Sequence, residues 1–450
     1  MTCEASIVKY NSLFKIILAI LFITSSLLII CPESAYSAPE PTTSNAFAAS
    51  NAFMGVGSCS SSNCHGSVSP RNATNVLQNE YVTWEKHDPH SKAWINLTNE
   101  DSKRIAYNLG IENPEKEPWC LRCHATYLED DARKGANFHI EDGVGCESCH
   151  GAAEKYLGPH TANDATRESN LANGMLDVVS PSKRVKLCAS CHFGDESQYV
   201  NHRLIGAGHP RLTFELDTFS MIQPKHWVVD EDYIRRKADY IPANAWLLGQ
   251  IELALLSIER LNSDKLSKDG IYPELTIFYC YACHHSLSEE QWKKREYSGR
   301  PGELQLNIAS VVIVKEALGS LDKNLSNLLE LSLQSLHENY KQGKKTDLKS
   351  LETALLNARK LIEKSGISVT EAKIIINSLS SYGAKSLNLQ YELAEQIAMG
   401  ISSLLASAYP DDTMHDNEIK RVYAALSDAA QFEPHDFSNA LADFKAKFSR

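Results

Sequence analysis

Positive charge is in short supply in this chain of 450 residues. Its 45 Lys and Arg residues are outnumbered by 56 Asp and Glu residues, which gives a formal net charge of −11 at pH 7. Such a chain lacks the excess of cationic side chains that binding to phosphate backbones requires, so nucleic acid is not expected as a partner. With 43% apolar and 22% charged residues, the composition is that of a globular protein and excludes both a disordered chain and a polytopic membrane protein.

Long apolar runs are scarce as well, and the main one lies near the first residue. Lys9 and Lys15 precede a mostly apolar run over residues 16–30, and the small residues of SAYSA follow. This order is typical of a secretory signal peptide, and the run is shorter than the roughly 20 residues of a membrane-spanning helix. We therefore expect a cleaved signal peptide over 1–37 and export to the periplasm. An uncleaved anchor and lipidation at Cys31 are the alternatives, and nothing beyond the leader indicates a membrane.

Spare cysteine is the third thing that the sequence lacks. Export exposes a chain to oxidising conditions, which disfavour loose thiols. Ten of the 12 cysteines lie outside the leader and form five close pairs, each followed directly by a histidine. The five clusters are Cys59, Cys64 and His65; Cys120, Cys123 and His124; Cys146, Cys149 and His150; Cys188, Cys191 and His192; and Cys280, Cys283 and His284. No cysteine outside the leader is left for another role.

Four of the five clusters read C-x-x-C-H, the motif of c-type haem attachment: CLRCH, CESCH, CASCH and CYACH. Two thiols at this spacing can add to the two vinyl groups on one porphyrin edge, and the adjacent histidine then becomes the proximal iron ligand. A zinc ribbon needs two pairs per metal and gives no reason for a histidine after every pair. Disulfides also leave the histidines unexplained. The motifs therefore predict four covalent haems c.

The remaining cluster, SCSSSNCHGS over 58–67, is a stretched version of the same motif. Its thiols lie two residues further apart, and the serines and the asparagine between them tolerate a bulged turn. A disulfide between Cys59 and Cys64 is the alternative, but it leaves His65 without a role. We therefore expect a fifth haem here, and five covalent haems c in the chain.

Second iron ligands must come from the other histidines. Eight of these eleven lie among the motifs: His87, His90, His139, His160, His202, His209, His226 and His285. We predict that His90, His160, His202, His209 and His285 are distal ligands.

Local sequence gives the reasons for this choice. The motif histidines His150 and His192 are each followed by another histidine ten residues on, at His160 and His202. His209 stands in GAGHP, whose glycines allow the backbone to approach a flat macrocycle closely. His90 is expected at the start of a helix after Pro89. His285 cannot reach the iron of His284, its neighbour in sequence, and is expected to serve another haem.

The motifs in their order resemble a known family. TWEKHDPHSKAWINL, CLRCH, GVGCESCHG and CASCH are similar, over residues 58–210, to the cytochrome c-554 type of multihaem cytochrome from the hydroxylamine-oxidising pathway. The resemblance implies that His90 and His160 are distal ligands and that the second haem, at Cys120, lacks a protein ligand on its far side. The sequence itself does not decide whether a histidine binds the far side of this iron, because His139, His202, His226 or His87 could do so. The stretched motif, the site at Cys280 and the last third of the chain depart from the family, so partner and pathway do not carry over.

The expected fold is mainly α. Residues 38–57 form a flexible linker, 58–300 a loop-rich pentahaem domain with short helices packed on a haem stack, and 301–450 an all-helical domain. The haem region has roughly 45 residues for each haem, so we expect the haem faces to supply much of its buried surface.

Apolar periodicity locates the longer helices. Residues 241–262 carry a helical stripe, and amphipathic segments lie at 304–318, 325–340, 348–363 and 389–408. Ser368 with Glu371 predicts a capping box at another helix start. QGKK at 342–345 and YGAK at 382–385 predict breaks between helices, and the last third should hold six or seven helices.

Together these features predict an exported protein that passes electrons through five covalent haems. Histidine on both sides of an iron leaves it six-coordinate, which suits electron transfer, and we identify no catalytic residue. Two alternatives stay open: a reductase of small nitrogen compounds that uses one open iron, and a docking subunit of a larger complex that binds through its helical third. The expected partners are redox proteins with basic docking patches, bound more weakly as salt rises.

Overall fold

The structure is a computed structural model that describes most of the chain after residue 50. The described residues are 51–71, 76–195, 198–264, 266, 273–284, 297, 304–344, 346–386, 388–410 and 413–448. The predicted leader at 1–37, the linker as far as residue 50, His285 and the predicted boundary at residues 300 and 301 lie outside them. The predicted domain limits stay predictions.

The expectation of a mainly α fold is confirmed. Over the described residues the structure has eighteen α-helices and no β-strand, and backbone pairing outside helices is limited to isolated bridges such as the one between Phe53 and Lys134. None of the described helices combines the length and the hydropathy that a bilayer crossing requires.

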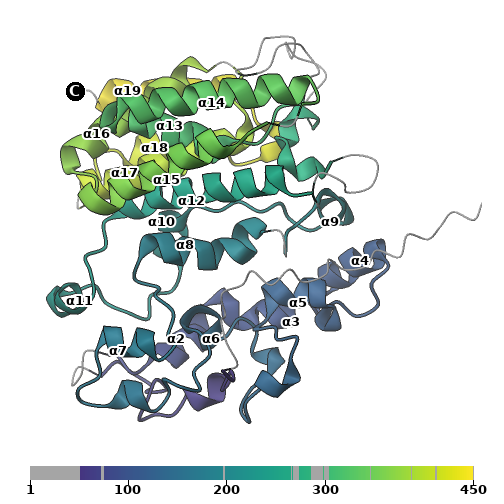
Figure 1. Ribbon diagram of the computed structural model, residues 1–450, viewed down its shortest axis with the longest axis vertical. Helices are drawn as coiled ribbons and strands as arrows, with labels where there is room; N and C mark the ends of the chain where they lie inside the picture. Colours follow the sequence, from purple (N-terminus) through teal and green to yellow (C-terminus); the bar gives the residue numbers. More distant parts are fainter. Residues whose placement is uncertain are drawn as a thin grey trace, which may run out of the picture. The chain divides into compact units, whose positions relative to one another are not determined.

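The part of the chain that carries the cysteine motifs is built from short helices (Figure 1). Its α-helices are α2 (Glu80–His87), α3 (Ala93–Asn96), α4 (Glu100–Leu109), α5 (Pro118–His124), α6 (Cys146–His150), α7 (Arg167–Ala172), α8 (Pro181–Ala189), α9 (His202–Ala207), α10 (Leu216–Ile222) and α11 (Glu231–Arg236). Single turns precede, separate or follow these helices: η1 (Val56–Ser58), η2 (Pro89–Lys92), η3 (Pro114–Lys116), η4 (Asp131–Arg133), η5 (Ile140–Asp142), η6 (Pro159–Thr161), the π-helical turn η7 (Ser190–Gly194), η9 (Leu275–Ile277) and η10 (Cys280–Ala282).

Apolar packing in this region is divided into small clusters. One lies around Phe214, Leu216 and Val185, a second around Phe53 and a third around Leu97. Such clusters bury little apolar surface for so many residues. Side-chain packing alone therefore supplies only a modest core here.

Longer helices begin with α12 (Figure 1). They are α12 (Pro242–Asn262), α13 (Ala309–Leu321), α14 (Lys323–Lys341), α15 (Lys349–Ser365), α16 (Val369–Lys385), α17 (Tyr391–Ala408), α18 (Asp416–Ala424) and α19 (Pro434–Phe448), with the turn η11 (Ala429–Gln431) before the last. The helix predicted over 241–262 and the capping box of Ser368 and Glu371 are confirmed. These helices share one large apolar core.

One segment of the helical third differs from the prediction. The segment 304–308 is not helical, because Leu306 forms an isolated bridge with Phe278 and α13 begins only at Ala309. The break predicted at YGAK falls at the end of this stretch, since α16 contains all four residues and ends at Lys385. Gly383 has a packing role: a β-carbon there would lie 2.3 Å from the side chain of Leu441 on α19. The glycine lets two helices approach closely.

Helix α12 contacts both the region of the cysteine motifs and the long helices. It packs against α8 and α10 as well as α13, α15 and α17. Trp246 is fully buried, and a β-carbon at Gly400 of α17 would lie 2.7 Å from its ring. A carboxylate of α12, Glu252, pairs with Arg359 of α15 at 2.7 Å. The motif region and the helical third are thus held together through α12.

Candidate functional site

The regular cysteine motifs lie on short helical turns. Helix α5 carries Cys120 and Cys123 together with His124, and α6 consists of the five residues of CESCH. Cys188 stands at the end of α8, where the chain passes into the π-helical turn that holds Cys191. A helical turn places residues three apart on the same face. Two thiols and a histidine are therefore presented together.

The stretched motif reaches a similar backbone relation by a different path. In the last regular motif the N–H of His284 donates to the carbonyl of Cys280 at 2.8 Å. In the stretched motif the N–H of His65 donates to the carbonyl of Cys59 at 3.1 Å, and a turn closed by Cys64 N–H and the Ser61 carbonyl at 2.8 Å takes up the added residues. The histidine thus keeps its hydrogen bond to the first cysteine.

Each motif histidine faces one histidine from elsewhere in the chain. The five pairs have ring centroids between 5.9 and 6.4 Å apart. They are His65 with His160 at 6.2 Å, His124 with His209 at 6.4 Å, His150 with His226 at 6.3 Å, His192 with His90 at 5.9 Å, and His284 with His202 at 6.1 Å.

This spacing fits a metal ion between the two rings. A metal–imidazole bond is about 2.0 to 2.1 Å, and a ring nitrogen lies about 1.1 Å from the ring centre, so two imidazoles on one metal have centroids about 6.2 to 6.4 Å apart. All five pairs lie at or near this distance, and in each pair one ring belongs to a motif histidine. The residues therefore fit an iron that is held from both sides, as in haem with two axial histidines.

The other histidines named as candidates lie apart from these pairs. His87 and His139 are exposed, and no imidazole of the described residues faces either of them. His285, predicted as a ligand, lies outside the described residues. His226 faces His150 but is not among the predicted ligands. Its spacing from the motifs carries no signal that could have singled it out.

At the second motif the family resemblance implies an iron without a protein ligand on its far side. His209 faces His124, and neither His139, His202, His226 nor His87 does. Gly208 ends α9 with φ of 118°, a left-handed conformation that favours glycine. The N–H of His209 then donates to the carbonyl of Leu204 at 3.1 Å. This turn brings His209 across from His124.

The sequence GVG before the third motif packs against the segment of His90. A β-carbon at Gly143 would lie 2.8 Å from the carbonyl oxygen of His90. The N–H of Val144 donates to that same oxygen at 3.0 Å, and the indole of Trp84 donates to the carbonyl of Val144 at 3.1 Å. Two stretches that carry the family resemblance thus hold His90 in place.

Two of the paired histidines bind a carboxylate through Nδ1. His65 Nδ1 lies 2.9 Å from Glu80 on α2, and His90 Nδ1 lies 2.8 Å from Asp88. The hydrogen bond to the carboxylate raises the pKa of each imidazole. Metal-binding histidines commonly donate their second ring nitrogen in this way, which orients the ring and increases its basicity.

Three further histidines use a backbone carbonyl for the same purpose. Nδ1 of His124 lies 3.1 Å from the carbonyl oxygen of Ala93, Nδ1 of His160 lies 2.9 Å from that of Tyr156, and Nδ1 of His209 lies 2.7 Å from that of Pro210. A ring that donates through Nδ1 has its Nε2 lone pair free for a metal.

Burial keeps several of the paired imidazoles neutral. It lowers the pKa of His150 and of His192 to about 4, and it lowers the pKa of His226 as well. Desolvation disfavours the charged form of a histidine. These rings are therefore neutral at pH 7, the form that can bind a metal.

The ten cysteines are free thiols in the structure. Burial raises the pKa of Cys120 and of Cys149 to about 12, which opposes the thiolate that a zinc site uses. Within the described residues no group of three or more Cys, His, Asp or Glu side chains is arranged to hold a metal ion. None of the ten cysteines takes part in a disulfide, so their thiols are available for thioether bonds.

Thiols from different motifs also meet. The neighbouring thiol of Cys146 lowers the pKa of Cys59, and that of Cys123 lowers the pKa of Cys191, so the two thiols of each pair lie close together. The first motif therefore lies beside the third, and the second beside the fourth.

Comparison with known proteins gives one match. Residues 58–151 match the family model described as cytochrome c554 and c-prime, a range that holds the first three motifs. No curated protein and no solved structure matches the chain. The family match, together with the motifs and the imidazole pairs, supports a c-type cytochrome that carries haem c and functions in electron transfer.

Proposed function

We propose that the chain is an exported pentahaem cytochrome that conducts electrons through five haems c, each held by two thioether bonds and two histidines. The observation that carries this proposal is the set of five imidazole pairs, in which every motif histidine has a partner at 5.9 to 6.4 Å. A haem iron supplies reversible one-electron chemistry when bound. The chain itself fixes the spacing of the sites, their axial ligands and their electrostatic surroundings.

Contacts between motifs support conduction from site to site. Cys59 meets Cys146, and Cys123 meets Cys191. His202 begins α9 and His209 follows two residues after the end of that helix, so the ligands of the fifth and second sites are connected by a single short helix. Attachment points in contact bring the edges of neighbouring macrocycles close together.

The reductase alternative needs an iron with a free position. Each of the five described motif histidines faces another histidine, and His209 faces His124 at the site that the family resemblance leaves open. This arrangement favours an electron carrier over a reductase of small nitrogen compounds.

Carbon monoxide distinguishes these two functions. We expect no fast spectral change when carbon monoxide is mixed with the fully reduced protein, because two imidazoles occupy the axial positions of every iron. The His209→Ala variant is the positive control and should gain a carbon monoxide band from one haem, since it frees the position opposite His124. A fast change in the unaltered protein, absent from Cys120→Ala, would support the reductase instead.

The proposal also covers export and the docking of redox partners. The predicted signal peptide over 1–37 directs the chain to the periplasm and is cleaved there. With a net charge of −11, and with haem propionates adding to it, the protein docks basic patches of redox partners, and the association weakens as ionic strength rises.

Hydrogen bonding to the axial ligands should set the haem potentials. We expect Glu80→Gln to raise the reduction potential of one haem by tens of millivolts, because the carboxylate 2.9 Å from His65 Nδ1 makes that ligand more basic and stabilises ferric iron. Potentiometric titration monitored by optical spectroscopy measures the change.

The matched control for this variant is Glu85→Gln. Glu85 lies on the same helix, α2, and pairs with Lys92 at 3.6 Å. The Glu85→Gln variant removes the same charge but leaves the hydrogen bond between Glu80 and His65 in place. Equal shifts in both variants would show that charge alone, without the bond to His65, sets the potential.

A further inference from the structure

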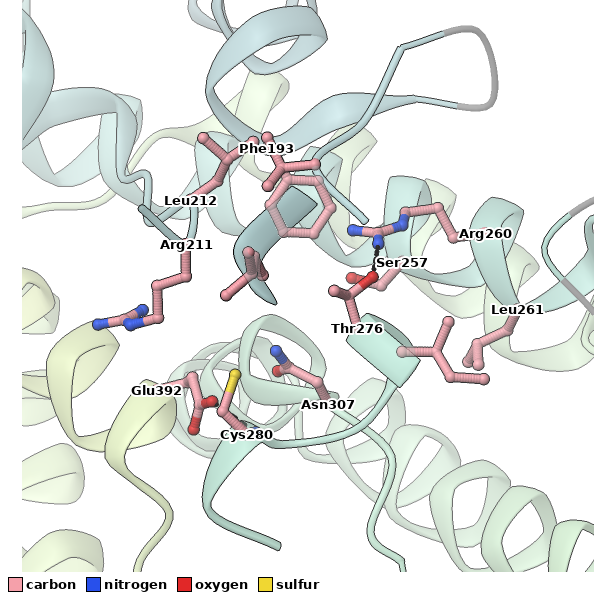
Figure 2. Close-up of a pocket in the computed structure, with 13 residues that line it drawn as sticks. Phe193, Arg211, Leu212, Ser257, Arg260, Leu261, Thr276, Cys280, Asn307 and Glu392 are labelled. Carbon is pink, nitrogen blue, oxygen red and sulfur yellow. Dashed lines mark hydrogen bonds between the residues drawn. The ribbon is translucent and has the colours of Figure 1, made fainter. Parts of the chain in front are cut away.

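A cavity lies beside Cys280, the first cysteine of the last motif. It is lined by residues on both sides of α9, by the end of α12, by the segment 276–280 and by α17 of the helical third. Figure 2 shows Arg260 reaching into the cavity from α12, with Cys280 and Glu392 together on another side. The cavity is thus shared by the motif region and the helical third.

The helical third holds the attachment point directly. Glu392 of α17 is buried, and its Oε1 accepts the N–H of Cys280 at 2.8 Å. Asn307, just before α13, also lines the cavity. The position of Cys280 is therefore fixed by residues far beyond the cysteine motifs.

Two arginines line the cavity, and their partners differ. Arg211 pairs with Glu395 of α17 at 2.5 Å, so its charge is neutralised within the protein. Arg260 donates from Nη2 to the hydroxyl of Thr276 at 2.9 Å, and its guanidinium carbon lies 5.5 Å from the ring centre of Phe193. Within the described residues no carboxylate lies within ion-pair distance of Arg260, and its buried Nε has no acceptor.

An arginine in this state lacks an anion. Burial lowers the pKa of Arg260, because a desolvated cation without a partner is costly. The nearby carboxylate of Glu274 is already engaged, since its Oε1 accepts the N–H groups of His202 at 2.7 Å and Thr276 at 3.0 Å. A planar guanidinium with a free N–H in a cavity is suited to a carboxylate ligand.

We propose that Arg260 binds a propionate of the haem attached to Cys280 and Cys283, and that this cavity receives the propionate-bearing edge of that haem. The inference rests on the proposed function, which places a haem at this motif. A haem c has its thioether bonds on one edge and its two propionates on the opposite edge. Arg260 enters the cavity away from Cys280 (Figure 2), as a propionate partner must. The helical third then forms part of the seat of the fifth haem.

The test compares Arg260→Met with the charge-conserving Arg260→Lys in the full mature holoprotein. Loss of the cation should favour ferric iron and lower the potential of one haem of the five. A tenfold change in its equilibrium constant corresponds to about 59 mV for a one-electron couple. Arg260→Lys should stay near the unaltered protein, and intact mass should show five haems in both variants.

Three results would overturn the proposal. One is an Arg260→Met protein with five haems and unchanged potentials. Another is equal loss of the haem at Cys280 in both variants, which would mean that the shape of the arginine matters and its charge does not. The third is a potential that moves with added nitrite in the unaltered protein and not in Arg260→Met, which would assign the cavity to a free anion.

A separate measurement tests the proposed function, on which this inference depends. Peptide mass spectrometry of the unaltered protein should find haem on the peptide of Cys280 and Cys283. Unmodified cysteines there would contradict the fifth haem itself, whereas a modified peptide with an indifferent Arg260 would contradict only the propionate contact.

Discussion

Replacement of Cys59 and Cys64 together by alanine should reduce the haem content of the mature protein from five to four. The reason is that the stretched motif keeps the hydrogen bond between His65 N–H and the Cys59 carbonyl, at 3.1 Å, and that His65 faces His160 at 6.2 Å. The loop therefore places the two thiols beside the pair formed by His65 and His160. Intact mass and a pyridine haemochrome assay measure the loss.

A control for this variant changes the loop and keeps the thiols. Ser60→Ala combined with Ser62→Ala alters two serines between Cys59 and Cys64, of which Ser60 is half-buried and Ser62 is exposed, and should leave five haems. If the unaltered protein carries four haems and a disulfide between Cys59 and Cys64, the stretched motif is not a haem site. An unchanged haem count in the double cysteine variant would lead to the same conclusion.

The prediction of the attachment half of each site depends on local sequence alone. A C-x-x-C-H motif is a single helical turn, so its chemistry depends on residues that are neighbours in the chain. The same holds for the long helices, where the periodicity over 241–262 predicts α12 almost to the residue. Features set by short separations in sequence are readable without the fold.

The pairing of the histidines was not readable in this way. His160 follows His150 by ten residues but faces His65, and His202 follows His192 by ten but faces His284. After His150 the chain turns at Gly151, with φ of 83°, and leaves the face of the motif. The ligand on the far side of an iron must come from a segment that approaches from the other direction. Such a segment is chosen by tertiary packing.

His226 illustrates the same limit from the opposite direction. It lies between Lys225 and Trp227, beyond the segment of family resemblance, and has no regular spacing from His150. Its half-buried ring packs edge-on against Trp227 at 5.0 Å and lies 6.3 Å from His150. Only the folded chain brings these residues together, and so His226 is absent from the predicted distal ligands.

Replacement of His226 by alanine should convert one low-spin haem to high spin while all five haems stay attached. Covalent attachment depends on Cys146 and Cys149, which the substitution leaves intact, whereas the axial position opposite His150 is vacated. An iron with one strong axial ligand becomes high spin. Electron paramagnetic resonance detects this change as a new high-spin signal and the loss of one low-spin signal. Added imidazole should restore the low-spin form by occupying the vacated position.

His139→Ala is the matched control for this variant. His139 is a histidine of the same region, but it is exposed and faces no imidazole of the described residues, so its loss should leave the spectrum unchanged. A spectrum of His226→Ala identical to that of His139→Ala would contradict the pairing of His226 with His150. Burial lowers the pKa of both His150 and His226, so both rings are neutral at pH 7, which is the form that can bind a metal.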